Sequence, residues 1–338
     1  MAAASMKDII AIGGSAGSGV ALRQLLRGLP PDLPASVFIS THIAASGPSF
    51  LLDMLSSSIN MPIDQVVDGQ PIELGRAYIA APDRHMLLLD GTIRLGTGPR
   101  ENMVRPSIDP LFRSAALSYG PRVIGVILSG MLNDGAAGLH AIKACGGTAV
   151  VQHPLDAEVD QMPLAALEAT DVDYVARAAE LGALLATLAE TEAGPARTPT
   201  EDLRFEVAIA AGRWVGSSEM LQIATPAALT CPECRGVLSE VNGSRPLRFR
   251  CQVGHAVSAE VLAAEIDEVE EAIGIAMRVM EERVTLVERM AADARQTGRN
   301  AVAELFDARA KEYRRYATTL REEAVTSLRH GGTAKQGP

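Results

Sequence analysis

Residues 1 to about 190 alternate short, almost continuously apolar runs with segments of helical periodicity. Apolar runs such as "DIIAIG", "SVFISTH" and "RVIGVILSG" are typical of strands that are covered on both faces of a sheet. Helix-like segments such as "GVALRQLLRGL" lie between several of these runs. The alternation predicts a doubly wound α/β fold with a mostly parallel sheet. A β-hairpin is expected where "HMLLLD" and "TIRLG" meet across Asp90 and Gly91.

The organisation of the chain changes beyond this α/β domain, which we assign to residues 7–190. Residues 191–224 begin with "TEAGPARTPTEDL", a small, polar and proline-bearing stretch that predicts a linker. Residues 225–257 contain the clustered cysteines, and residues 258–326 place apolar side chains at alternating spacings of four and three. That spacing predicts an antiparallel helical hairpin with its turn in "ARQTGRN". A disordered tail is expected over residues 327–338.

Composition limits the class of protein. The formal net charge of −10 and a pI of about 5.2 argue against sequence-independent binding to nucleic acid. No apolar run approaches the length that crosses a bilayer, and the first residues, "MAAASMKD", lack the features of a signal peptide. Three of the four cysteines lie close together, which fits a metal site in a reducing compartment better than a disulfide framework. We therefore expect a cytoplasmic protein that neither binds nucleic acid nor inserts into membranes.

A glycine-rich loop follows the first predicted strand, in "IAIGGSAGSGVAL" over residues 10–22. No three of its glycines have the spacing of a dinucleotide-binding loop, and Val20 stands where a P-loop requires lysine. The segment "GGSAG" instead matches G-x-S-x-G, a strand–turn–helix elbow that would expose Ser15 as a nucleophile. A plain glycine-rich turn explains the motif equally well, so the interpretation depends on partners for the serine.

A serine nucleophile needs an imidazole that accepts its proton and a carboxylate that orients the imidazole. His42 ends the second predicted strand, so it should emerge at the same edge of the sheet as Ser15. Asp134 follows the strand "VIGVILSG" in a loop of small residues, where it is either this carboxylate or a cap for the next helix. Three other histidines start a predicted strand, lie within a helix or follow the sheet core, and are less well placed: His85, His140 and His153.

Five separated motifs occur in order over residues 7 to about 188: "IGGSAGS", "STHI", "DGQPIELGRAYIAAPDRHMLL", "RPSIDPLFRSAA" and "GVILSGMLNDGAAGLHAIKACGG". Together they resemble the catalytic domain of CheB, the chemotaxis protein-glutamate methylesterase. The resemblance implies a doubly wound α/β domain that hydrolyses γ-methyl esters of glutamate on chemoreceptors, with a related glutamine deamidation. The elbow departs from the Ser-Thr-Gly-Gly of many family members, because Ala16 replaces the threonine and any role of its hydroxyl is lost.

Carried over by motif, Ser15 would be the nucleophile, His42 the general base and acid, and Asp134 the orienting carboxylate. The backbone N–H groups of Ala16 and Met131 would hold the oxyanion. The resemblance implies no cofactor for catalysis and, as partner, the methylated cytoplasmic helices of a chemoreceptor or a similar signalling protein. Because the matching motifs begin so near the start of the chain, we expect no receiver domain, which usually precedes this catalytic domain.

The cysteine cluster lies in "CPECRGVLSEVNGSRPLRFRCQVGH". Cys231 and Cys234 form a C-x2-C pair, and Cys251 and His255 form a C-x3-H pair after a predicted β-hairpin. This is the spacing of a closed Cys3His zinc site, whereas incidental thiols beside a core histidine are the alternative. Because four ligands at compatible spacing rarely coincide, we favour a structural zinc in a zinc-ribbon-like module. Cys145 stands apart in a helix–strand connection and is expected to be a packed thiol.

Two other functions stay open at this point. A non-catalytic signalling adaptor of the same fold would use the zinc module and the hairpin for interactions, but it would be free to lose Ser15, His42 and Asp134. A serine esterase for small-molecule substrates would keep these three residues. The short connections near the elbow favour, weakly, an open site suited to protein surfaces. The stripe on the helical hairpin favours intramolecular packing over docking to a partner.

Overall fold

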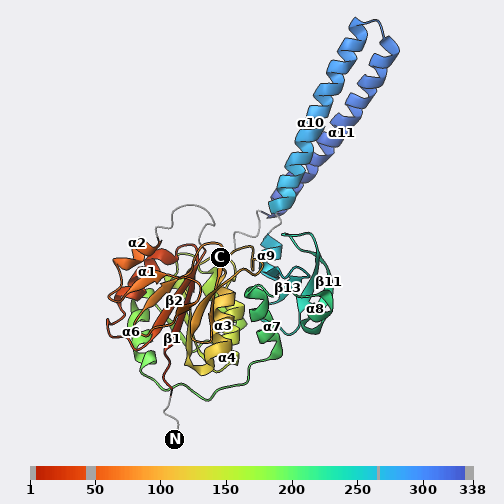
Figure 1. The fold of residues 1–338 in the computed structure, drawn as a ribbon. Coiled ribbons are helices and arrows are strands. Elements are labelled where there is room, and N and C mark those ends of the chain that lie inside the picture. The colour runs from red at the N-terminus through yellow and green to blue at the C-terminus, as the bar shows by residue number, and fades with distance from the viewer. Residues whose placement is uncertain (1–4, 43–50, 265–266, 332–338) are drawn as a thin grey trace. The chain divides into compact units, whose positions relative to one another are not determined.

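The computed structural model describes residues 5–42, 51–264 and 267–331 (Figure 1). The chain divides into two compact units, Met1–Leu262 and Ala263–Pro338. The first unit contains the α/β domain and the cysteine-bearing module, and the second unit contains two long helices.

A seven-stranded parallel sheet forms the centre of the α/β domain. Its strands are β1 (Ile9–Gly14), β2 (Ser36–Thr41), β3 (Ile63–Gln65), β5 (Ala77–Ile79), β8 (Val123–Ile127), β9 (Thr148–Gln152) and β10 (Tyr174–Ala176). In space they follow the order β10-β9-β8-β1-β2-β5-β3. Ile9 and Ala11 pack into one core cluster, whereas Ile10 and Ile12 pack into another, so both faces of β1 are buried. This explains why the strands read as continuous apolar runs.

Helices cover both faces of this sheet (Figure 1). They are α1 (Ser18–Arg27), α2 (Leu51–Ser56), α3 (Ile108–Tyr119), α4 (Ala136–Ala144), α5 (Gln161–Ala169) and α6 (Ala178–Ala189), with short 3-10 turns at Gly120–Arg122 and Pro154–Asp156. Leu22 of α1 and Leu181 of α6 belong to the core cluster that contains Ile12, whereas Phe112 of α3 belongs to the cluster that contains Ile9. The predicted doubly wound α/β fold is therefore confirmed.

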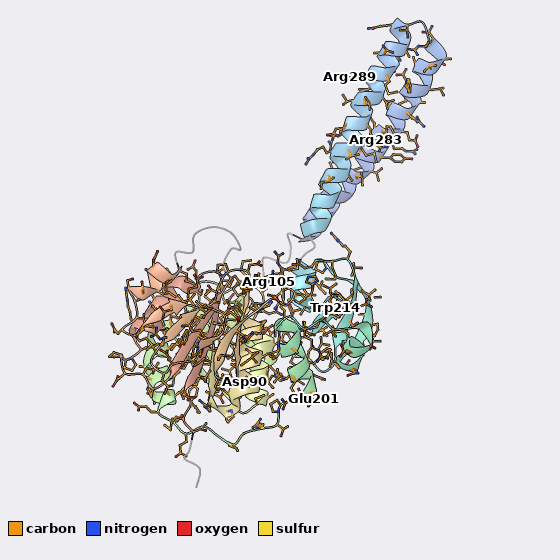
Figure 2. The ribbon with its side chains drawn as sticks, viewed as in Figure 1. Asp90, Arg105, Glu201, Trp214, Arg283 and Arg289 are labelled. Carbon is orange, nitrogen blue, oxygen red and sulfur yellow. The ribbon has the colours of Figure 1, made fainter. Side chains whose placement is uncertain are left out.

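The predicted β-hairpin is present, and it belongs to a separate sheet. Strands β6 (His85–Leu89) and β7 (Thr92–Gly96) pair in antiparallel fashion, and β7 also pairs with β4 (Gln70–Pro71). Asp90, labelled in Figure 2, and Gly91 form the turn with φ angles of 48° and 75°. Because the hairpin forms its own sheet, every pairing in the main sheet is parallel.

Residues 191–224, for which the sequence predicts a linker, contain two helices, α7 (Glu201–Ala210) and α8 (Ser217–Ile223). The side chain of Thr200 caps α7 by accepting a hydrogen bond of 3.2 Å from the backbone amide of Leu203. Leu203 and Val207 of α7 are buried in the core cluster that also contains Ile9. The small and proline-bearing residues that suggest a linker precede this helix, so composition alone conceals it.

The cysteine-bearing module is a four-stranded antiparallel sheet of order β11-β12-β13-β14. Its elements are β11 (Ala224–Thr230), β12 (Val237–Val241), β13 (Arg248–Cys251), β14 (Ala256–Ser258) and the short helix α9 (Ala259–Ala264). Strands β12 and β13 form the hairpin that the sequence predicts around Asn242 and Gly243. Leu238, Phe249 and Val257 give the module a small core of its own.

The second unit consists of α10 (Asp267–Gln296) and α11 (Asn300–Gly331), joined by a turn in which Gly298 has a φ of 73°. Three ion pairs, spaced seven residues apart along each helix, link the two helices in antiparallel register: Glu281–Arg321, Glu288–Arg314 and Arg295–Asp307. Helix α11 continues through residues 327–331 of the predicted tail because no proline or glycine interrupts it before Gly331, and residues 332–338 lie outside the described residues. No helix in the described part of the chain is both long and apolar enough to cross a bilayer.

Candidate active site

Three neighbouring strands of the sheet end in the residues that the sequence singles out. Ser15 follows β1, His42 follows β2, and Asp134 lies in the loop after β8. Strand β1 is paired with β2 on one side and with β8 on the other, so the carboxyl ends of all three strands meet at one edge of the sheet. The chain runs from β1 to β2 on one side of it and only later to β8 on the other side, so the strand order reverses at β1. Open α/β sheets bind their ligands at the carboxyl ends of the strands where the order reverses.

The turn around Ser15 requires glycine at two positions. Gly17 precedes α1 with a φ of 73°, a left-handed conformation that L side chains rarely adopt. Gly130, in the loop after β8, lies so close to the elbow that a Cβ there would be 2.9 Å from the Cβ of Ser15. The backbone amide of Ser15 donates to the carbonyl of Ser129 at 2.9 Å, which ties the elbow to this neighbouring loop. The elbow and the loop carrying Asp134 are thus held together.

The three side chains form a continuous hydrogen-bonded chain. Ser15 Oγ lies 2.8 Å from His42 Nδ1, and His42 Nε2 lies 2.8 Å from Asp134 Oδ2. Because the Asp134 carboxylate only accepts hydrogen bonds, Nε2 carries the proton that faces it, and Nδ1 accepts from the serine hydroxyl. The side chain of His42 is 24% exposed and that of Asp134 only 2%, so the chain runs from the surface into the interior.

The N-terminus of α3 surrounds the Asp134 carboxylate with donors. Its Oδ2 accepts from the amide of Ile108 at 2.7 Å, and its Oδ1 accepts from Ser107 Oγ at 2.7 Å and from Asn102 Nδ2 at 3.1 Å. Burial raises the pKa of Asp134, but the hydrogen bonds and charge of His42 and the donors of Ile108 and Ser107 outweigh it and lower the pKa to about 2. The carboxylate therefore stays ionised beside the imidazole.

A second buried carboxyl, that of Asp109, lies beside Asp134. The backbone amide of Asp109 lies 3.4 Å from Asp134 Oδ1, and Asp109 Oδ1 accepts from the amide of Gly138 at 2.6 Å. Burial and the neighbouring Asp134 charge raise the pKa of Asp109 to about 7. The pKa values of the two carboxyls are thus shifted in opposite directions, and Asp134, the one in contact with His42, keeps its charge.

The backbone amides of Ala16 and Met131, close to Ser15, have no acceptor among the described residues. Ala16 follows the serine directly, two residues before α1 begins, and Met131 follows Gly130, on which a Cβ would lie 2.9 Å from the serine Cβ. Met131 is 55% exposed, so this position is open to a ligand. Free amides at a helix N-terminus and in an adjoining loop suit a developing oxyanion.

The part of the chain that carries this site is similar to a known protein family. Residues 10–185, more than half of the chain, match the family model of CheB methylesterase. The chain belongs to the CheB methylesterase family. A solved structure titled as the CheB methylesterase catalytic domain of Thermotoga maritima superimposes with a TM-score of 0.51 at 30% identity, covering 54% of this chain and 98% of that one.

Curated relatives match this CheB-family chain over the same part. A Leptospira interrogans protein named putative protein-glutamate methylesterase/protein-glutamine glutaminase is 42% identical over 169 residues, which is 50% of this chain and 88% of that protein. A protein-glutamate methylesterase/protein-glutamine glutaminase 2 of Anaeromyxobacter dehalogenans is 40% identical over 174 residues, 52% of this chain and 51% of the relative. The chain thus spans about half the length of the second relative. The CheB family match ends at residue 185, before the module and the long helices.

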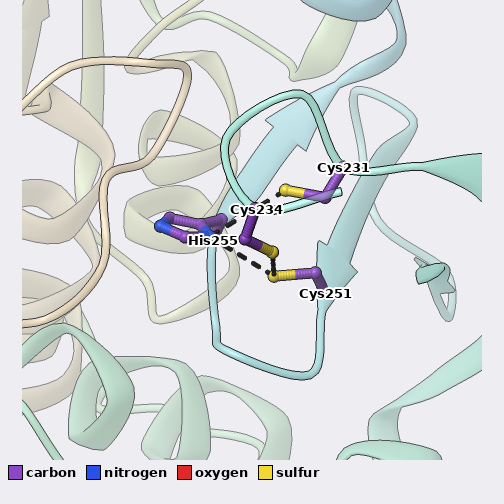
Figure 3. Close-up of side chains that lie close together, drawn as sticks. All are labelled: Cys231, Cys234, Cys251 and His255. Atoms are coloured by element: carbon purple, nitrogen blue, oxygen red, sulfur yellow. Dashed lines mark hydrogen bonds between the residues drawn. The ribbon is translucent and has the colours of Figure 1, made fainter. Parts of the chain in front are cut away.

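The module of this CheB-family chain brings four metal-ligating side chains together (Figure 3). The ligand atoms of Cys231, Cys234, Cys251 and His255 all lie within 4.8 Å of one another. His255 Nδ1 lies 3.5 Å from Cys251 Sγ and 3.9 Å from Cys231 Sγ, and the thiols of Cys234 and Cys251 are 3.6 Å apart. Such separations fit four ligands around one tetrahedral ion, so the residues present can hold a metal.

Not all the residues that contact Asp134 are evident from the sequence. Ser107 lies in the quoted motif "RPSIDPLFRSAA", but Asn102 lies in a loop that offers no periodic signal. Arg105 (Figure 2) fixes this loop by donating to Asp83 Oδ1 at 2.7 Å and to the carbonyl of Gly98 at 2.8 Å. The other three histidines that the sequence offers do not take the place of His42. His85 forms hydrogen bonds with the Pro99 carbonyl and the Ser107 amide, and His153 accepts from the Leu155 amide. His140 lies on α4.

Proposed function

We propose that this chain is a protein-glutamate methylesterase that also deamidates protein glutamine side chains. One observation carries the proposal: in a CheB-family domain, Ser15 Oγ, the His42 ring and the Asp134 carboxylate are linked by two contacts of 2.8 Å. A serine hydroxyl in contact with an imidazole that is itself held by a buried carboxylate is the arrangement of a serine hydrolase.

The reaction proceeds through an acyl-serine. His42 Nδ1 accepts the proton of Ser15 as Oγ attacks the carbonyl carbon of the glutamyl methyl ester. The amides of Ala16 and Met131 hold the oxyanion, while the Asp134 charge stabilises the imidazolium. The tetrahedral intermediate then collapses, Nδ1 returns the proton to the methoxy oxygen, and methanol leaves.

Hydrolysis of the acyl-serine repeats the same steps with water. His42 accepts a proton from water as the water oxygen attacks the acyl carbon, and the proton is then returned to Ser15 Oγ. The products are the free glutamate side chain and the regenerated serine. With glutamine as substrate, ammonia leaves in place of methanol and the acyl-serine is the same.

The substrate and the compartment are part of this proposal. We infer that the substrate is a methylated glutamate on the cytoplasmic helices of a chemoreceptor or a related signalling protein, as the names of the relatives suggest. All four cysteines are free, and three of them lie in the metal-ligating cluster, which requires reduced thiols. This favours the cytoplasm as the place of action.

We also propose that Cys231, Cys234, Cys251 and His255 hold one structural zinc ion. The support is the donor set and its separations, since three sulfurs and one imidazole nitrogen within 4.8 Å suit tetrahedral Zn²⁺. Four protein ligands leave no open position for substrate, so the ion would supply folding energy to the module rather than chemistry. Catalysis itself uses only Ser15, His42, Asp134 and backbone amides.

The direct test is release of methanol from a methyl-labelled receptor fragment by the full chain. We expect turnover by the wild type and a loss of at least about 10³-fold in Ser15→Ala. Ser56→Ala, which changes an exposed serine on α2, is the matched control and should keep wild-type activity. Methanol release by Ser15→Ala at the wild-type rate would remove Ser15 from the mechanism. Hydrolysis of small esters without any release from receptor would identify a small-molecule esterase instead.

A further inference from the structure

Strand β14 of the module lies directly against the loop that contains Asn102. The backbone amide of Asn102 donates to the carbonyl of Ala256 at 2.8 Å, and the amide of Ala256 donates to the carbonyl of Arg100 at 3.3 Å. Ala256 follows His255, a member of the Cys3His cluster. The metal-ligating cluster is therefore one residue away from a backbone pairing with the α/β domain.

The side chain of Asn102 joins this strand to the candidate triad. Its Nδ2 donates to Asp134 Oδ1 at 3.1 Å, while its Oδ1 accepts from the backbone amide of Ser258 at 3.1 Å. Asn102 has a φ of 50°, a left-handed conformation that asparagine tolerates better than most residues. The amide oxygen is thus bound to β14 and the amide nitrogen to Asp134, with Asp109 Oδ2 as a second, longer acceptor at 3.4 Å.

A second bridge passes through Asn133, the residue before Asp134. Asn133 Oδ1 accepts from Ser258 Oγ at 2.7 Å, and its Nδ2 donates to Glu260 Oε2 at 2.5 Å. Asn133 and Ser258 are 2% and 1% exposed, so water does not compete for the contact between these two side chains, whereas Glu260 lies at the surface. The loop that carries the carboxylate is thereby held from the side of the module.

Apolar and ionic contacts reinforce the two bridges. Met103 and Leu132, which have φ angles of 66° and 58°, pack against the core of the module. Arg250 of β13 is fully buried and donates to Glu101 Oε1 at 3.1 Å. Glu101 directly precedes Asn102 in the chain. The left-handed backbone at Met103, next to Asn102, and at Leu132, two residues before Asp134, is therefore stabilised in part by contacts with the folded module.

We propose that the Cys3His module is a positioning element of the active site. In this proposal, which rests on the proposed esterase function, β14 holds Asn102 and Asn133, and these two positioning residues set the orientation of Asp134 and hence of His42. Zinc binding would act on catalysis through this route, because the His255 ligand fixes the start of β14. Ser107 and Ile108 still hold the carboxylate when the bridges are cut, so activity falls without disappearing.

Two variants cut the two bridges separately in the full chain. Ser258→Ala removes the hydroxyl that binds Asn133, and that also accepts from the amide of Val261, but keeps the backbone amide that binds Asn102. Ser258 has no hydrogen bond to a triad side chain among the described residues. Asn102→Gly removes the other bridge while accepting the positive φ. Ser239→Ala is the matched control, since Ser239 is a buried serine on β12 of the same module whose side chain makes no hydrogen bond among the described residues.

We expect kcat for a small ester to fall about tenfold in Ser258→Ala and in Asn102→Gly, with KM and bound zinc unchanged. The NMR signal of the His42 Nε2 proton, which reports its hydrogen bond to Asp134, should shift in both variants and stay in place in Ser239→Ala. Wild-type kcat and an unshifted signal in the two bridge variants would overturn the proposal while leaving the esterase intact. Turnover by Ser15→Ala would instead overturn the esterase function itself, so the two failures are distinguishable.

Discussion

Ser107 donates a hydrogen bond of 2.7 Å from its hydroxyl to Oδ1 of Asp134, while the oxygen on the other side, Oδ2, faces His42. Loss of this donor leaves the buried carboxylate less well stabilised, so its pKa should rise and His42 should be held less firmly. We expect Ser107→Ala to lower kcat for ester hydrolysis about tenfold, measured by steady-state kinetics. The acid limb of the pH–rate profile should move to higher pH.

The control for this variant is Ser118→Ala, in the same helix α3. Ser118 Oγ donates to the carbonyl of Leu88 at 2.8 Å, far along the helix from the carboxylate. Its loss should cost roughly 1 kcal/mol of folding free energy and leave kcat unchanged. Equal kcat values for the two variants would show that the Ser107 hydroxyl does not act on Asp134.

The raised pKa of Asp109 should make the stability of the folded protein depend on pH. Its pKa is raised by burial and by Asp134 to about 7, whereas an unfolded aspartate titrates near 4. The stability that its protonated form contributes is complete below about pH 4 and is lost as the pH rises through about 7. Asp109→Asn cannot ionise, so its free energy of unfolding relative to wild type should increase by on the order of 1 kcal/mol or more between about pH 5 and about pH 8.

Urea unfolding of both proteins at the two pH values measures this difference. Asp32→Asn, which changes an exposed aspartate, is the control and should show a difference from wild type that is the same at both pH values. A constant difference for Asp109→Asn as well would mean that Asp109 is already ionised in the folded protein at low pH.

Replacement of the buried Arg250 should lower the stability of the fold strongly. It is fully buried and donates to Glu101 Oε1 at 3.1 Å and to Glu206 Oε1 at 3.0 Å. Arg250→Met leaves both carboxylates with fewer partners in a buried site, so the free energy of unfolding should fall by about 3–5 kcal/mol in a denaturant titration. Arg204→Met, which removes an exposed pair with Glu201 on α7, should change it by less than about 1 kcal/mol. Similar values for the two variants would contradict a structural role for the buried ion pairs.

Metal content gives an independent test of the module. Native mass spectrometry of the full chain should show one zinc ion per chain, lost in Cys234→Ser. Cys145→Ala is the matched control, because Cys145 is buried in the core of the α/β domain and should leave the zinc in place. Wild-type protein that is purified and folded without zinc, and that does not bind it on addition, would refute the zinc assignment.

The strands that carry the site, β1, β2 and β8, and the residues at their ends could be predicted because these strands are buried on both faces. Such strands read as apolar runs, and a polar residue directly after one of them, such as His42 after β2, falls at the active edge of a parallel sheet. The cysteine cluster could also be predicted from the sequence, because the short spacings C-x2-C and C-x3-H each bring two ligands together in one turn.

The contacts between the module and the α/β domain could not be predicted from the sequence. Arg250 and Glu101 are 149 positions apart, and nothing in the pattern of either segment indicates that two charged side chains are buried there. Asn102 lies in a loop with no periodicity, and its role depends on a left-handed backbone that asparagine shares with many exposed turns. Long-range pairing of polar groups is a property of the packed fold, not of local composition.

The proposed mechanism depends above all on Ser15 being a nucleophile that His42 activates. The most direct measurement is to treat the full chain with a fluorophosphonate, which reacts covalently with activated serines, and to map the modified peptide by mass spectrometry. We predict a single adduct on Ser15 in the wild type, formed at least about 10²-fold more slowly in His42→Gln. An unmodified Ser15 in protein that still hydrolyses the ester, or labelling of Ser15 at the same rate without His42, would contradict the account.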